Sequence, residues 1–129
     1  MTLCYLVLAL SALAGAAKDL RAAGAGEVRA FMVVLATIEP MHGNVLALYL
    51  GEDLKRQVLT DRMTEGHALA WAGLMSNDTL IVAGWRGKGG GVIAFSSVGG
   101  DRWRETVVDD GGMACEDLCL GDLDGDKDL

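Results

Sequence analysis

The sequence predicts an all-β fold built from short antiparallel strands. From residue 44 onward, short apolar runs alternate with clusters of glycine, asparagine and aspartate. Strands repeated every 8–12 residues, roughly, and separated by such turn signals are typical of an all-β sandwich, barrel or propeller. The chain also has 18 glycines and one proline, a composition that disfavours long helices. We therefore expect helix at most in the first twenty residues or so.

Each expected strand is a β-rich or apolar run that ends at a turn signal. The expected strands are residues 45–50, 56–60, 68–74, 79–85, 92–96 and 103–108. Upstream, residues 27–31 and 32–38 fit two further strands, but residues 18–43 do not form a complete repeat. The glycine-rich run 87–91 is expected to be a hairpin connection, because it lacks the Gly-Lys-Ser/Thr signature of a phosphate-binding loop.

An internal repeat narrows the choice of architecture. Shifting the sequence by 49 residues places Leu69 on Leu118 and Leu74 on Leu123, without a gap. A repeat of this length, holding four strands, has the size of a β-propeller blade. We expect a β-propeller fragment of about two four-stranded antiparallel blades over residues 44–129, the second incomplete. In this alignment, residues 115–120 form the first strand of a following blade.

The N-terminal segment is apolar. Residues 1–17 carry no charged side chain, and the run 3–10 is followed by small residues. This pattern is typical of a signal peptide and its cleavage site, and it predicts a secreted or cell-surface protein. The usual basic stretch before the apolar run is missing. A buried strand, a mis-assigned start and a short membrane anchor therefore remain alternatives.

The net charge argues against nucleic-acid binding, and the cysteine spacing argues against a disulfide. A net charge of −7 argues against nucleic-acid binding, which needs basic patches. Cys4 lies in the apolar N-terminal segment. On an extended strand Cys115 and Cys119 would stand roughly 13 Å apart, beyond the reach of a disulfide. We expect these two to be buried thiols that act as small hydrophobic residues.

The last eight residues have an aspartate at every second position. These are Asp122, Asp124, Asp126 and Asp128. In a twelve-residue calcium loop, positions 1, 3 and 5 supply side-chain oxygens, and position 7 supplies its carbonyl. The spacing therefore predicts a Ca²⁺ site, although Lys127 stands at position 6, where glycine is usual. The alternative is a solvated acidic tail.

The run Asp-Leu-Asp-Gly-Asp, followed by Asp-Leu, resembles the loop of FG-GAP/VCBS-type repeats, the blades of secreted and cell-surface β-propellers. The resemblance implies a calcium-binding module that binds a carbohydrate or another small-molecule ligand, or that acts as a scaffold. It also implies that the partners include the remaining propeller blades of a longer chain.

Polar residues gather in the connections that would share one face of such blades. If the strands of a blade run A to D, the B–C and D–A connections lie together, and they carry His42, His67 and Arg86. We expect Glu116 or Asp117 to reach the same place from the next blade. Arginine as an anion clamp, histidine as a general base and a carboxylate suit a site for a sugar or an acidic metabolite. The alternative is that each histidine only stabilises a turn.

Segments 37–43, 66–69 and 82–87 are also similar to the propeller part of aldos-2-ulose dehydratase-type proteins, in which a propeller is joined to cupin domains. This resemblance implies, as an alternative function, a carbohydrate lyase that dehydrates keto-sugars by proton abstraction. The sequence contains no cupin segment. Trp85 and Trp103 are expected to pack between blades.

Overall fold

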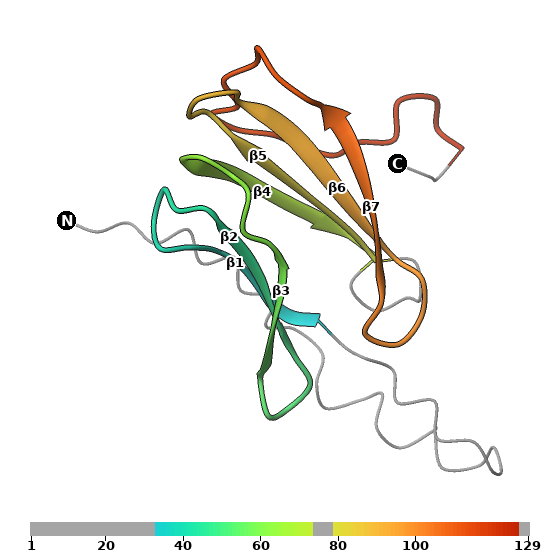
Figure 1. Ribbon diagram of the computed structural model, residues 1–129. Coiled ribbons are helices and arrows are strands. Elements are labelled where there is room, and N and C mark those ends of the chain that lie inside the picture. Colours follow the sequence, from blue (N-terminus) through green and yellow to red (C-terminus); the bar gives the residue numbers. More distant parts are fainter. Residues whose placement is uncertain (1–32, 74–78, 127–129) are drawn as a thin grey trace, which may run out of the picture.

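The computed structural model describes residues 33–73 and 79–126, and in these residues the fold is all-β, without helices (Figure 1). The strands form two antiparallel sheets, in the orders β1-β2-β3 and β4-β5-β6-β7. The first sheet comprises β1 (Val33–Glu39), β2 (Val45–Leu50) and β3 (Lys55–Thr60). The second comprises β4 (Gly66–Ala72), β5 (Leu80–Trp85), β6 (Gly91–Ser97) and β7 (Trp103–Asp109). Each strand pairs with its neighbour in sequence, so both sheets are simple meanders.

The main core lies between the two sheets. Side chains alternate between the faces of a strand, so every second residue of β2 can point toward the second sheet. Leu46, Leu48 and Leu50 are buried in this way and belong to one cluster with Ile81 and Phe95. Trp85 and Trp103, which were expected to pack between blades, pack against this cluster between the two sheets.

A second, smaller core covers the opposite face of the four-stranded sheet. It contains Ala68, Val82 and Val92 of the sheet, and Cys115, from the segment after β7, packs on them. Leu118 and Leu120 pack against the same cluster. The chain that follows β7 therefore crosses back over β4, β5 and β6, and so makes the four-stranded sheet the middle layer.

The expected strands agree closely with the structure. Residues 45–50 coincide with β2, and the strands expected at 32–38, 56–60, 68–74, 79–85, 92–96 and 103–108 overlap β1 and β3–β7 to within two residues at either end. The four-stranded meander expected for one repeat is present, whereas the first sheet has three strands in the described residues. The signal peptide expected at 1–17, most of the irregular stretch 18–43 and the strand expected at 27–31 lie outside those residues.

One expected strand was wrong. Residues 115–120 follow the sheet surface but form no strand. The reason is that a strand requires a hydrogen-bonded neighbour, and no part of the described chain pairs with this segment. The expectation for the thiols was half correct, because Cys115 is buried but Cys119 is exposed.

Candidate functional site

Four stretches of chain meet at one end of the two sheets: the β1–β2, β3–β4 and β5–β6 connections and the segment after β7. Backbone hydrogen bonds join them. Gly66 N–H donates to Gly43 C=O at 2.8 Å, and Cys115 N–H donates to Trp85 C=O at 3.2 Å. A third bond, also 2.8 Å long, runs from Gly87 N–H to the carbonyl of Thr64. These bonds hold the connections at this end together as one platform, and the side chains described below project from it.

Glycine at position 87 makes this close approach feasible. A Cβ atom there would lie 2.5 Å from the carbonyl oxygen of Thr64. That is far inside van der Waals contact, and the obstacle is backbone that cannot swing away. The β5–β6 connection can therefore dock on the β3–β4 connection only because residue 87 has no side chain.

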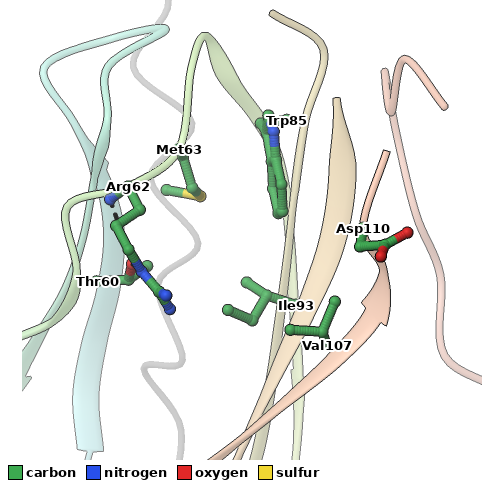
Figure 2. Close-up of a pocket in the computed structure, with 7 residues that line it drawn as sticks. All are labelled: Thr60, Arg62, Met63, Trp85, Ile93, Val107 and Asp110. Carbon is green, nitrogen blue, oxygen red and sulfur yellow. Dashed lines mark hydrogen bonds between the residues drawn. The ribbon is translucent and has the colours of Figure 1, made fainter. Parts of the chain in front are cut away.

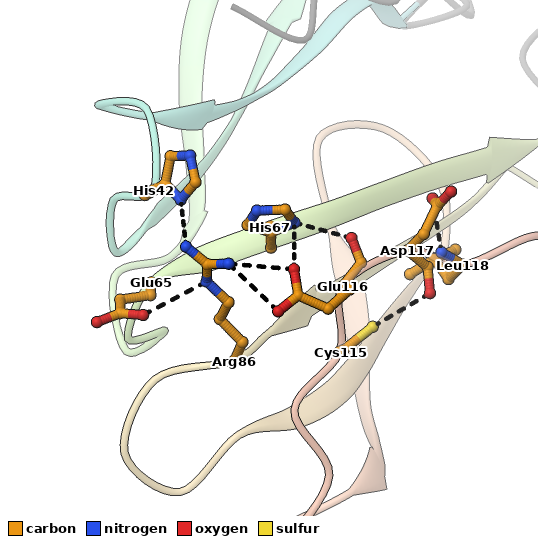
Figure 3. A network of polar contacts seen from close by, with 8 residues as sticks. All are labelled: His42, Glu65, His67, Arg86, Cys115, Glu116, Asp117 and Leu118. Carbon is orange, nitrogen blue, oxygen red and sulfur yellow. Dashed lines mark hydrogen bonds and ion pairs between the residues drawn. The ribbon is translucent and has the colours of Figure 1, made fainter.

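The platform carries a polar cluster that consists of His42, Glu65, His67, Arg86 and Glu116 (Figure 3). Arg86 is its centre. Its Nη1 donates to both carboxylate oxygens of Glu116, at 3.1 and 3.2 Å, and its Nη2 donates to Nδ1 of His42 at 3.2 Å. The two imidazole rings stand edge to face, with centroids 4.7 Å apart. His67 Nδ1 donates to the backbone carbonyl of Glu116 at 2.8 Å.

These hydrogen bonds specify how the two imidazoles are arranged. A guanidinium can only donate, so Nδ1 of His42 must present its lone pair to Arg86. A carbonyl oxygen can only accept, so Nδ1 of His67 must carry a hydrogen. In the neutral form of His67 the lone pair is therefore on Nε2. The side chain of His67 is largely buried, with 16% of its surface exposed.

Arg86 is held from a third side by Glu65. The Nε of Arg86 lies 3.5 Å from Oε2 of Glu65, which is an ion-pair distance. The contact is not a hydrogen bond, and Nε is buried without a hydrogen-bond partner in the described structure. The ion pair still holds the guanidinium in place, because opposite charges attract at this distance without an aligned N–H. Arg86 thus faces two carboxylates and one imidazole.

The structure brings together the three site residues expected from the sequence. His42 comes from the β1–β2 connection, His67 from the start of β4 and Arg86 from the end of β5. Of the two expected carboxylates, Glu116 reaches the cluster. Asp117 does not, because its Oδ1 accepts from the N–H of Leu118 and its side chain points elsewhere (Figure 3).

Two features of the cluster were not predicted. Glu65 was missed, although it directly precedes the Gly66-His67 pair in the sequence and so lies in a connection already singled out. None of the five residues lines the cavity between the two sheets. The cluster is a packed ion network between connections.

The acidic loop near the C-terminus is the second candidate site. One carboxylate oxygen from each of Asp122, Asp124 and Asp126 lies within 4.8 Å of the others, and all three residues are exposed. Asp122 Oδ1 accepts from the N–H of Gly125 at 2.6 Å, and Gly125 has a φ of 81°, a conformation that suits glycine. The expected fourth ligand, Asp128, lies outside the described residues.

The donor set of this loop fits a hard cation. Carboxylate oxygens suit Ca²⁺ or Mg²⁺, whereas zinc sites use histidine and cysteine more. Ca²⁺ also accepts irregular geometry and oxygens at about 2.3–2.6 Å, which an exposed loop of aspartates can provide more easily than strict octahedral geometry. The three aspartates could therefore hold Ca²⁺.

Comparison with known proteins identifies no relative. No family model, no curated protein and no solved structure matches this chain. In residues 33–73 and 79–126, there is no helix with the length and apolarity needed to span a membrane.

Proposed function

We propose that this chain is a calcium-binding β-propeller repeat module of a secreted or cell-surface protein. The observation that carries the proposal is the convergence of three aspartate oxygens within 4.8 Å of one another, shortly after a four-stranded meander. A four-stranded antiparallel meander is the unit of a propeller blade, and in the proposed module the segment after β7 would lead into the next blade. A Ca²⁺ ion would order the loop at that junction.

The physical role of the ion follows from the charges. Three carboxylates so close together repel one another, and a divalent cation turns that repulsion into attraction. Asp122, Asp124 and Asp126 would bind through side chains, with the carbonyl of Asp128 as a fourth ligand. Ca²⁺ takes six to eight oxygens, roughly, so water would complete the shell, and a Kd of about 1 mM is expected by analogy with the weakest extracellular sites.

The module would serve as a scaffold or would bind a carbohydrate or another small molecule at the end of the sheets. Its partners would include further propeller blades, which cover the exposed faces and edges. The polar cluster supports ligand binding at that end, since it offers an arginine, two imidazoles and two carboxylates within one site.

Calorimetry with CaCl₂ tests this proposal. We expect the chain to bind Ca²⁺ with a millimolar Kd, to bind Mg²⁺ more weakly, and to lose measurable binding in Asp124→Ala. The matched control is Asp53→Ala, which removes an exposed aspartate from the β2–β3 turn and should leave Ca²⁺ binding unchanged. Equal Ca²⁺ binding by the chain and by Asp124→Ala would rule out the loop.

A second candidate function is that of a carbohydrate lyase, supported by the 4.7 Å separation of the His42 and His67 rings beside Arg86. In this scheme Nε2 of His67 takes the proton α to the carbonyl of a keto-sugar. The resulting enolate expels the β-hydroxyl, which leaves as water after it receives a proton from the imidazolium. Arg86 would stabilise the enolate oxygen, as a preorganised donor does most effectively. Glu116 would have to release Arg86 to make room.

This function predicts a sharp effect of two substitutions. His67→Gln should lower the turnover of a keto-sugar, followed by absorbance of the unsaturated product, by roughly 10²–10⁴-fold without unfolding the chain. Arg86→Lys should also lower it, whereas Arg102→Lys, in the exposed β6–β7 turn, should not. Absence of turnover in the unmodified chain, or activity that survives His67→Gln, would leave the polar cluster with a structural role only.

A further inference from the structure

A cavity of about 180 Å³ lies between the two sheets, apart from both sites described above (Figure 2). It is lined by residues from β3, the β3–β4 connection, β5, β6, β7 and the residue after β7. These are Thr60, Arg62, Met63, Trp85, Ile93, Val107 and Asp110. None of them belongs to the polar cluster or to the acidic loop.

The walls of the cavity are mostly apolar, and its size fits a small ring. Met63 and Ile93 are buried, Trp85 is partly buried, and Val107 stands at the exposed side. An engineered apolar cavity of about 150 Å³ is large enough to bind benzene. The cavity measures about 180 Å³ over all its lining residues and is partly open to solvent, so it has room for a six-membered ring with a short substituent.

The charges at the rim are not balanced. Arg62 and Asp110 both line the cavity, from opposite sides, and the carboxylate of Asp110 points outward, away from Trp85 and Ile93 (Figure 2). The guanidinium of Arg62 is already paired, because its Nη2 donates to Oε1 of Glu105 at 2.5 Å and its Nε donates to Oγ1 of Thr60 at 3.4 Å. Asp110 is exposed and has no hydrogen bond or ion pair with any described residue. The unpaired charge at the outer rim of the cavity is thus a carboxylate, which a ligand would reach with a group that extends outward from the apolar space.

We propose that this cavity binds a small primary amine with an apolar body, such as an arylalkylamine. The ring would fill the space beside Trp85 and Ile93, and the ammonium group would pair with Asp110. The indole face of Trp85 also favours a nearby cation. The chain's net charge of −7 adds a long-range attraction for cations and disfavours anions.

Benzylamine is a direct probe of this site, with benzyl alcohol and benzoate as matched neutral and anionic rings. Binding is measured on the full chain from the shift of the Trp85 indole N–H signal in two-dimensional NMR, assigned with a Trp85→Phe sample. We expect benzylamine to bind about two- to fivefold more tightly than benzyl alcohol, as for an exposed ion pair, and benzoate to bind most weakly. Benzoate binding as tightly as benzylamine, or no shift with any ring, would overturn the proposal.

Two pairs of variants locate the ring and the charge. Val107→Phe should fill the cavity and abolish binding, whereas Thr106→Phe should not, because neighbouring residues of a strand point to opposite faces. Asp110→Asn should reduce benzylamine binding to that of benzyl alcohol. Glu52→Gln removes a distant exposed charge and should leave the ratio between the two ligands unchanged. If Val107→Phe and Thr106→Phe had the same effect on binding, or if Asp110→Asn and Glu52→Gln did, the amine would bind at another surface.

Discussion

At the scale of single residues, the carboxylate of Glu39 accepts hydrogen bonds at both of its oxygens. Its Oε1 accepts from Thr37 at 2.6 Å and from Tyr49 at 2.7 Å, and its Oε2 accepts two bonds from the guanidinium of Arg56 at 2.8 and 3.1 Å. Partial burial raises the pKa of Glu39, but the hydrogen bonds from Arg56, Thr37 and Tyr49 outweigh it, and the net pKa is lower than the ordinary 4.5. The contacts tie β1 to β2 and β3.

This arrangement predicts a pH-dependent contribution to stability. Because the folded-state pKa lies below the unfolded value, the contribution is fully present above about pH 4.5 and is lost as the pH falls through the folded pKa. Glu39→Gln should therefore lower the free energy of unfolding at pH 7 by about 1–2 kcal/mol. The difference between the two proteins should shrink below pH 4.5 or so.

The measurement is urea unfolding at a series of pH values, followed by tryptophan fluorescence. Other carboxylates titrate in the same range, so only the difference between the variant and the parent reports on Glu39. Glu52→Gln provides a control for the loss of one negative charge at an exposed site. Curves for Glu39→Gln and the parent that remain parallel from pH 7 to below pH 4 would contradict the assignment.

Some features of the polar cluster could be predicted from the sequence, and others could not. Blade topology was enough to predict that His42, His67 and Arg86 converge, because it determines which connections share an end of the sheets. It could not predict that Glu65 would also face Arg86, or which of Glu116 and Asp117 would pair with it, since both depend on side-chain distances of 3.1–3.5 Å. The cavity between the two sheets could not be predicted either, because its shape depends on how the two sheets pack.

At the scale of elements, the segment after β7 depends on one small residue beneath it. A Cβ atom on Gly84 would lie 2.3 Å from Sγ and 2.8 Å from Cβ of Cys115. Cys115 in turn is buried over Ala68 and Val82. Burial and the nearby charges of Asp117 and Glu116 raise the pKa of the Cys115 thiol, which therefore remains protonated and apolar.

Gly84→Ala should therefore displace the segment after β7 from the surface of the sheet, without unfolding the sheet itself. We expect the variant to expose Cys115 to alkylation by iodoacetamide, which in the parent chain should modify Cys119 much faster, since Cys119 is exposed. Mass spectrometry of the alkylated peptides measures both rates. The double variant Gly84→Ala, Cys115→Gly should restore the docked segment, seen as protection of its amides from hydrogen exchange, because both contacting atoms are removed. Slow alkylation of Cys115 in Gly84→Ala would contradict the close contact.

The elements themselves were mostly predictable, for a definite reason. The residues of β2 and β5 are apolar and stop at glycine- or aspartate-containing turns, so the local pattern coincides with the pairing. Residues 115–120 were expected to form a strand from the 49-residue alignment, yet they form none, because pairing is a property of two segments and a sequence alignment describes only one. The same limit explains why the number of strands in the first sheet could not be read from the sequence.

At the scale of the whole molecule, two stacked meanders leave an open edge and exposed apolar side chains. Among the described residues, β7 pairs on one side only. Val107 and Val108 on this strand are 54% and 62% exposed. Unpaired strand edges with apolar side chains are templates for pairing with another chain, and closed rings of blades protect such edges.

The isolated chain is therefore expected to self-associate through β7. Light scattering after size exclusion should give a mass above the 13.6 kDa of one chain, rising with concentration. Val108→Lys should shift the mass toward one chain, because a lysine on an edge strand costs desolvation when another strand docks. Val98→Lys, in the β6–β7 turn, makes the same chemical change away from the edge and should have no such effect. A single species of 13.6 kDa at every concentration, with a cooperative thermal transition, would show that the two sheets need no further covering.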